Sequence, residues 1–315
     1  MLEHKVIYTS DMHGNKKQFG TFLEYAMQVK PQTLIIGGEL APKDVNINLR
    51  DVRYIEAQRK FLGDELPKLI DDFKHGSPDT NVFLMLGNDD CAVNLGVLAE
   101  HPDLYREIHG KRFRVDDAHE IVGYSFVPIT PFGIKDFEKF DLSRVPDAVR
   151  KEYEQRKKSG YRFDGIRSVN SPSLGWQTYS FSQSQESNDS IQRDLESETF
   201  TARPGNTIYI LHTPPNNTAL DIIQDGEHVG SFAVREFIEK YQPKLTLHGH
   251  IHETVDMSGK FMEQIGSSTM MSSGNHNYDS KVAVVEFDLY NPASAQRKKL
   301  PCGKVGKMIN RLLGK

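Results

Sequence analysis

The chain has 315 residues, of which 37% are hydrophobic and 26% are charged, and its net charge is -4. This length allows one large α/β domain with a sizeable core, and the slightly negative charge excludes a general affinity for nucleic acid. The two cysteines, Cys91 and Cys302, lie far apart in no CxxC pattern, which argues against a disulfide framework and a thiolate-bound metal. The first residues lack a signal-peptide pattern and no apolar run reaches membrane-spanning length, so we expect a cytoplasmic protein.

Short apolar runs rich in β-branched residues alternate along the chain with segments of helical periodicity. This alternation predicts strands joined by helical crossovers, paired mainly in parallel. The predicted strands are residues 6–9, 34–36, 82–86, 121–127, 208–211, 245–247 and, as the last strand, 282–287. Helices are predicted from the Asn15 cap to Pro31, over residues 55–73 with an interruption near Pro67, and after the Ser231 cap.

Two segments differ from this pattern. Residues 135–205 are charged and then rich in Ser, Gln and Asn, and they contain Trp176 and a predicted short helix over 190–198. We interpret them as an insert in a domain of residues 1–290, either a lid or a decorated surface. Residues 291–315 form a basic tail with an apolar stripe, which predicts an amphipathic helix. It either docks on its own domain or makes a weak contact with a membrane or a protein.

Metal-binding residue types follow several of the predicted strands directly. The motifs, in chain order, are Asp11-Met12-His13, Gly37-Gly38-Glu39, Gly87-Asn88-Asp89-Asp90, His212 and Gly249-His250-Ile251-His252. Because the chemistry of open α/β sheets lies beyond the carboxyl ends of the strands, these side chains are expected to converge. Carboxylate, amide and imidazole without thiolate favour Mn²⁺, Fe or Zn²⁺. The glycines Gly38, Gly87 and Gly249 would permit tight turns and a close backbone approach to an ion or a phosphate.

In this order the motifs resemble the signature of the calcineurin-like metallophosphoesterases: DxH, GD, GNH followed by Asp or Glu, a lone His, and GHxH. The sequence also resembles bacterial and archaeal members of this superfamily that read GNDD at the third motif. The resemblance implies a four-layer α/β sandwich of two mixed β-sheets flanked by helices, with a centre of two divalent metal ions. The implied ligands are Asp11, His13 and His252 for one ion, Asn88, His212 and His250 for the other, and Glu39 as the bridge.

The resemblance also implies a reaction, the hydrolysis of a phosphate mono- or diester by a metal-bridging hydroxide. Asn88 and His212 would help to stabilise the charge on the phosphate, and Asp89 would handle a proton or orient a water. The chain departs from the family at two positions. Glu39 replaces an aspartate and adds a methylene, which predicts altered metal spacing and reduced activity. Asp89 replaces the histidine that protonates the leaving group, and a carboxylate near two cations is a poor acid.

Two further histidine motifs lie outside this ligand set. His228 precedes a helix start that would present backbone amides to an anion, so it either contacts the substrate or belongs to an ordinary helix entry. The tripeptide Gly274-Asn275-His276 matches GNH, but it lacks a preceding apolar run, and we interpret it as a decoy.

The main alternative to an enzyme is a binding or scaffold protein that keeps this fold with a catalytically weak site. The changes at Glu39 and Asp89 motivate this alternative. A nucleic-acid-processing role is a third hypothesis, although the sequence shows no basic groove interleaved with aromatic residues. A phosphorylated substrate is the expected partner.

Overall fold

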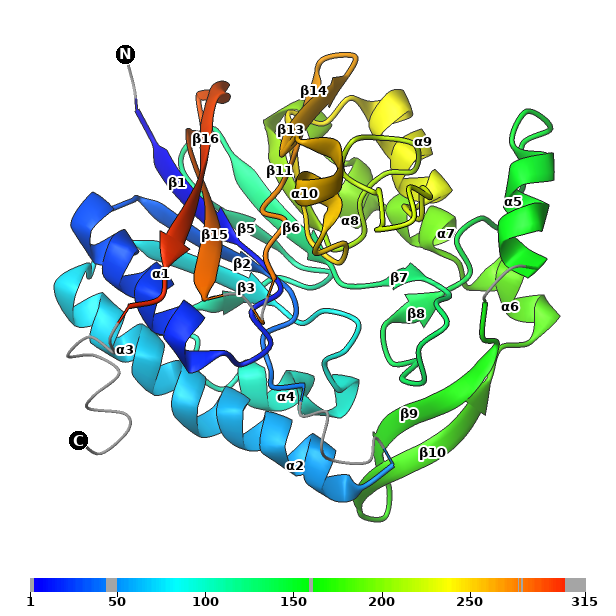
Figure 1. Cartoon of the computed structure of the whole chain (residues 1–315), viewed down its shortest axis with the longest axis horizontal. Coiled ribbons are helices and arrows are strands. Elements are labelled where there is room, and N and C mark those ends of the chain that lie inside the picture. The colour runs from blue at the N-terminus through cyan, green and yellow to red at the C-terminus, as the bar shows by residue number, and fades with distance from the viewer. Residues whose placement is uncertain (1–2, 44–49, 159–160, 277, 279, 304–315) are drawn as a thin grey trace.

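The computed structural model describes residues 3–43, 50–158, 161–276, 278 and 280–303. Its strands form two mixed six-stranded sheets that face each other (Figure 1). The first sheet has the order β16 (Asn291–Pro301), β15 (Lys281–Asp288), β1 (Lys5–Thr9), β2 (Thr33–Gly37), β3 (Asn81–Met85) and β4 (Arg106–Glu107). The second has the order β13 (Met262–Ile265), β14 (Ser268–Ser272), β12 (Leu245–His248), β11 (Thr207–Leu211), β6 (Glu120–Tyr124) and β5 (Arg112–Arg114).

Helices cover the outer face of each sheet, so the molecule has the four predicted layers (Figure 1). On the side of the first sheet lie α1 (Lys16–Val29), α2 (Val52–Lys60), the π-helical turn η1 (Phe61–Glu65), α3 (Leu66–Gly76) and the short η2 (Ala92–Asn94) and α4 (Leu95–Leu98). On the side of the second lie α7 (Ile191–Leu195), α8 (Glu198–Thr201), η3 (Pro204–Asn206) and α9 (Phe232–Tyr241), with α10 (Thr254–Ser258) after β12. The helix expected over residues 55–73 runs without a gap from α2 through η1 to α3. The expected interruption near Pro67 takes the form of the π-helical turn η1, which directly precedes the α3 turn that contains this proline.

Successive side chains of each strand point to opposite faces of the sheet, and together they fill three apolar layers. In β1, Val6 and Tyr8 point into the core between the two sheets, whereas Ile7 packs under α1 and α3. In β11, Ile208 and Ile210 face that same central core, and Tyr209 packs against α9. Strands buried on both faces read as continuous apolar runs, which is why the sequence located them.

The segment expected as an insert is largely structured. It contains β8 (Glu138–Lys139), paired with β7 (Val127–Pro128), then α5 (Arg150–Lys158), the antiparallel pair β9 (Asp164–Asn170) and β10 (Leu174–Ser180), and α6 (Gln183–Asn188). Trp176 of β10 packs against Tyr54 of α2, with ring centroids 6.2 Å apart, and its Nε1 donates to the Asp51 carbonyl at 3.2 Å. The hairpin therefore docks on the side of α2 (Figure 1), and the predicted helix over 190–198 is seen as α7 and α8.

The C-terminal part of the domain differs from the expected arrangement. The strand at residues 281–288 is not the last, because β16 follows it and pairs with it along the edge of the first sheet. The first 11 residues of the expected tail thus form a sheet strand, and the boundary lies beyond residue 290. The predicted amphipathic helix lies outside the described residues. Among those residues, no helix has the length and apolar character needed to cross a bilayer.

Candidate metal centre

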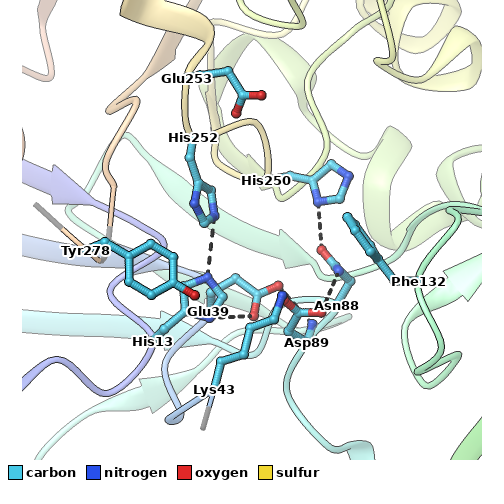
Figure 2. A pocket seen from close by; sticks show the side chains of 10 residues that line it. All are labelled: His13, Glu39, Lys43, Asn88, Asp89, Phe132, His250, His252, Glu253 and Tyr278. Atoms are coloured by element: carbon cyan, nitrogen blue, oxygen red, sulfur yellow. Dashed lines mark hydrogen bonds and ion pairs between the residues drawn. The ribbon is translucent and has the colours of Figure 1, made fainter. Parts of the chain in front are cut away.

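The predicted ligand motifs follow the carboxyl ends of strands from both sheets. Strands β1, β2 and β3 are parallel, as are β11 and β12, so their following loops meet at one edge of the sandwich. The side chains surround a pocket of about 240 Å³ (Figure 2). Its lining consists of His13, Glu39, Lys43, Asn88, Asp89, Phe132, His250, His252, Glu253 and Tyr278. Asp11 and His212 are buried directly behind this lining.

The metal-binding atoms from distant motifs lie within a few ångströms of each other. His13 Nε2 is 3.4 Å from His252 Nε2, and Asp11 Oδ1 is 3.9 Å from that same nitrogen. Asn88 Oδ1 is 2.7 Å from His250 Nδ1. Atoms that share one ion at about 2.0–2.2 Å lie roughly 3 Å apart, so these separations suit coordination after small adjustments. The residues predicted from the sequence are therefore brought together rather than splayed.

Glu39 occupies the centre of this arrangement. Its Oε1 is 3.2 Å from His212 Nε2, and its Oε2 is 3.7 Å from His13 Nδ1. His13 and His212 are the two histidines that the motif order assigns to different ions. The Glu39 carboxylate thus lies between these two histidines despite its added methylene.

Two buried polar atoms in the pocket have no hydrogen-bond partner among the described residues: His13 Nδ1 and Glu39 Oε2. Leaving such groups unpaired costs about 1–3 kcal/mol each, a cost that a bound cation would remove. One ligand atom from each of His13, Glu39 and Asp89 also lies within 4.8 Å of the other two. Because the donors are imidazole, carboxylate and amide, the residues fit a divalent ion of the Mn, Fe or Zn type.

Backbone strain is concentrated in the same loops. Asp11, His13, Glu39 and His250 all have positive φ, between 44° and 66°. Such conformations cost of the order of 1–3 kcal/mol per non-glycine residue, and surrounding contacts must hold them. We infer that the fold is stable enough to carry this cost at the positions where the side chains must point inward.

The three glycines of the motifs allow the strands to approach closely, as predicted. A Cβ on Gly38, whose φ is +110°, would lie 2.5 Å from His212 Nδ1. A Cβ on Gly87 would lie 2.6 Å from the backbone nitrogen of Glu39, and one on Gly249 would lie 2.7 Å from Asp11 Oδ2. Only Gly38 needs the left-handed conformation, and the other two are required by space.

Two residues outside the predicted ligand set position these loops. Asp90 accepts from the backbone N–H groups of Leu40 (3.0 Å), Ala41 (2.9 Å) and Gly87 (2.8 Å), and so ties the Glu39 loop to the Asn88 loop. Asn275 Nδ2 donates to the carbonyls of Ser10 (3.1 Å) and Asp11 (3.3 Å). The GNH tripeptide interpreted as a decoy thus supports the Asp11 turn through its asparagine.

Asp89 is paired with a lysine that the sequence motifs did not single out. Lys43 Nζ donates to Asp89 Oδ2 at the pocket wall. Burial opposes ionisation of Asp89, but the charge of Lys43 and its hydrogen bond prevail and lower the pKa of this carboxyl. The lowered pKa leaves Asp89 ionised at neutral pH, and Lys43 is a cause that the sequence argument did not include.

The histidines of the pocket differ in charge according to their neighbours. Burial lowers the pKa of His13 and of His252 to about 4, so both imidazoles are neutral near pH 7. For His212 burial acts the same way, but the carboxylates of Glu39 and Asp11 prevail and raise its pKa to about 9. Burial and Asp89 raise the pKa of Glu39 as well, to about 8. The Glu39 and His212 pair therefore retains a proton near pH 7.

His212 is oriented by a backbone contact on its far side. Its Nδ1 lies 3.0 Å from the Gly37 carbonyl, which sets Nδ1 as the donor and turns Nε2 towards Glu39. His228, for which the sequence leaves a substrate contact and an ordinary helix entry open, does not line the metal pocket. Its Nδ1 is 2.7 Å from Asp221 Oδ1, and it lines a second cavity rather than the metal pocket.

Sequence reasoning missed several residues of the pocket wall. Lys43, Phe132, Glu253 and Tyr278 belong to no motif, and Phe132 and Tyr278 flank the pocket on opposite sides (Figure 2). Phe132 is 47% exposed and Tyr278 is 74% exposed. The only sequence signal for Phe132 is an aromatic residue in the Pro131-Phe132-Gly133 turn, and such a signal is too common to be useful.

Known proteins are similar to this chain in sequence family and in fold. The family model described as calcineurin-like phosphoesterase matches residues 4–254. A crystal structure of the protein TT1561 of Thermus thermophilus has a TM-score of 0.51 at 13% identity, covering 96% of this chain and 100% of that one. Another, of a dimetal phosphatase from Danio rerio, has a TM-score of 0.47 at 10% identity, covering 95% and 96%. The search of curated proteins found no match.

Proposed function

The chain belongs to the calcineurin-like phosphoesterase family, and we propose that it hydrolyses phosphate mono- or diesters with the help of two divalent metal ions. The observation that carries the proposal is the Glu39 carboxylate, which has one oxygen 3.7 Å from His13 and the other 3.2 Å from His212. A carboxylate placed between two sets of ligands is the arrangement that paired ions require.

The donors near Glu39 divide into two groups. The first ion would be held by Asp11, His13, Glu39 and His252, and the second by Glu39, Asn88, His212 and His250. Divalent ions bound there would supply positive charge for the phosphoryl oxygens and would lower the pKa of a water molecule. Mn²⁺, Fe and Zn²⁺ all suit this donor set.

The protein groups themselves would bind and orient the phosphate. Asn88 and His212 line or back the pocket and would stabilise negative charge on the phosphoryl group. The Lys43 ammonium lies at the pocket wall and would contact a phosphoryl oxygen, with Asp89 holding it in place. Because Asp89 is ionised, proton transfer to the leaving group would come from solvent, which favours substrates whose alcohols are good leaving groups.

The proposal is tested with purified protein loaded with Mn²⁺ and assayed on an aryl phosphate monoester and a diester. We expect turnover that requires the metal, with His250→Ala reducing it to background. Background turnover in the wild-type protein at every metal tested would contradict the proposal.

The second candidate, a scaffold protein with a weak site, is motivated by two changes: the added length of Glu39 at the bridging position, and Asp89 in place of the histidine of the family motif. The two candidates are separated by Glu39→Asp. If the wild type is inactive and this substitution confers turnover, the scaffold hypothesis gains. If the wild type is active and Glu39→Asp lowers its turnover, the glutamate is the functional bridge. The phosphorylated substrate and the cytoplasmic location remain part of this proposal.

A further inference from the structure

A second cavity of about 370 Å³ adjoins the metal pocket. Phe132, His250 and Glu253 line both, so the two spaces share a wall. This volume lies in the range of about 300–1,000 Å³ that is typical of small-molecule sites. The metal pocket at about 240 Å³ suits a phosphoryl group with its ions, and the larger space beside it remains for another part of the ligand.

The wall of the second cavity is mainly apolar. Besides Phe132, its apolar members are Pro128, Ile129, Pro131, Ile223, Val229 and Ile251. Phe132 leaves 47% of its surface exposed although it lies beside a polar pocket. An exposed aromatic ring at a concave site favours stacking with another ring. Lys43 Nζ lies over one face of Phe132, 5.4 Å from the ring centroid, so a stacked ring would use the other face.

The polar part of the wall is held rigidly by buried contacts. His228 Nδ1 binds Asp221 Oδ1 at 2.7 Å, and the fully buried Asp221 also accepts from the N–H groups of Thr218 (2.9 Å) and Gly230 (3.0 Å). Arg156 donates from Nη2 to the Gly230 carbonyl at 2.9 Å. With Nδ1 bound by Asp221, Nε2 is the nitrogen of His228 that a ligand would meet.

The segment of residues 135–205 contributes part of this wall. Arg156 lies in α5 and Tyr161 lies between α5 and β9, within residues 135–205. The family motifs all lie outside that segment. The insert thus contributes Arg156 and Tyr161 to a cavity beside the metal pocket, and such variable segments are where substrate choice is expected to be determined.

We propose that the second cavity binds the organic part of the substrate, and that this part is an aromatic ring system. The phosphoryl group would lie in the metal pocket, and the ring would stack on Phe132 with a polar substituent near His228. This inference rests on the proposed function for the phosphoryl position. It assigns the substrate to the class of phosphate esters of aromatic or ring-bearing alcohols.

The test compares two phosphonates that cannot be hydrolysed, 1-naphthylmethylphosphonate and methylphosphonate, by calorimetry on the Mn²⁺-loaded protein. Both carry the same anionic group, so the ratio of their dissociation constants reports the ring alone. Burying the ring is expected to make the naphthyl compound bind about 10- to 100-fold more tightly. Equal affinities in the wild-type protein would overturn the inference.

Variants locate the effect within the molecule. Ile223→Trp and Val229→Trp fill the second cavity and are expected to reduce the ratio to within about threefold without weakening methylphosphonate binding. Met257→Trp is the matched control, because Met257 is 43% exposed and lines neither cavity. A ratio that survives both filling variants would place the ring elsewhere and overturn the inference.

A further measurement separates this inference from the proposed function. Saturation-transfer NMR with 1-naphthylmethanol requires neither metal binding nor turnover. Contact with the wild-type protein that is lost in Ile223→Trp supports the cavity assignment even if turnover is absent. No contact with the wild-type protein contradicts the assignment even if the enzyme is active.

Discussion

The loops that hold the metal donors differ from the hairpin of β9 and β10 in backbone conformation and in the space around their glycines. In the loops, Asp11, His13, Glu39 and His250 adopt positive φ, and Gly38 has no room for a Cβ. In the hairpin, Gly175 has open space around it, and Trp176 makes the principal aromatic contact with the rest of the domain. Strain is carried where side chains must converge, and a peripheral hairpin carries almost none.

The largest expected effect is the loss of a metal donor. His250→Ala removes an imidazole 2.7 Å from Asn88 and is expected to reduce kcat/KM at least about 10²-fold, because misplacement of an ion by about 1 Å already has that effect. Steady-state kinetics and elemental analysis of the bound metal measure it. His75→Ala, on an exposed histidine of α3, should change neither quantity. Full activity in His250→Ala would remove this histidine from the centre.

A pair of glycine substitutions tests the difference in strain directly. Gly38→Ala places a Cβ 2.5 Å from His212 at φ +110° and should lower the free energy of unfolding by about 3 kcal/mol. Gly175→Ala, in open space, should stay within about 0.5 kcal/mol of the wild type. Denaturant unfolding of both proteins gives the comparison. Equal losses would show that the loops are no more constrained than the hairpin.

Removal of the Lys43 charge should have an intermediate effect. Lys43→Met deprives Asp89 of its partner and the phosphate of a contact, which predicts about a tenfold lower kcat/KM. The same change should raise the pKa of Asp89, since Lys43 is the leading charge that lowers it. Activity should therefore fall at a higher pH on acidification than in the wild type. Lys281→Met, on an exposed lysine, is the control, and an unchanged acid limb would contradict the assigned pairing.

Removal of the hairpin anchor should have the smallest effect on function. Trp176→Ala deletes the ring that packs on Tyr54 and should lower the free energy of unfolding by about 1–2 kcal/mol, since the side chain is only partly buried. Turnover should stay unchanged, because the hairpin lines neither the metal pocket nor the second cavity. Trp176→Phe should restore most of the stability. A large loss of turnover at unchanged stability would indicate instead that the hairpin acts as a lid.

The same comparison explains what the sequence could reveal. Strands β1, β2, β3, β11 and β12 are apolar on both faces, and each ends in a motif, so their order and the convergence of their loops were predictable. Strand β16 could not be predicted in this way, because its side chains are mostly exposed and polar along the sheet edge. The segment Asn291–Pro301 therefore has the composition of a tail although it is a strand. Strands β13 and β14 were missed for want of a long apolar run.

The missed residues of the pocket share a different cause. Lys43 becomes a partner of Asp89 only because Asp90 ties the two loops together, and no local pattern records that contact. Asn275 supports the Asp11 turn across more than 260 positions of sequence. Such roles depend on tertiary proximity, whereas metal-binding residue types after strands are visible in the sequence itself.

The central claim is that Glu39 lies between two ions held by the surrounding donors. The most direct test is an anomalous difference map from a crystal of the protein soaked in Mn²⁺ and measured at the manganese edge. We predict two peaks about 3.5–4 Å apart, one on each side of the Glu39 carboxylate. Manganese peaks elsewhere in the crystal, with none beside Glu39, would contradict the account.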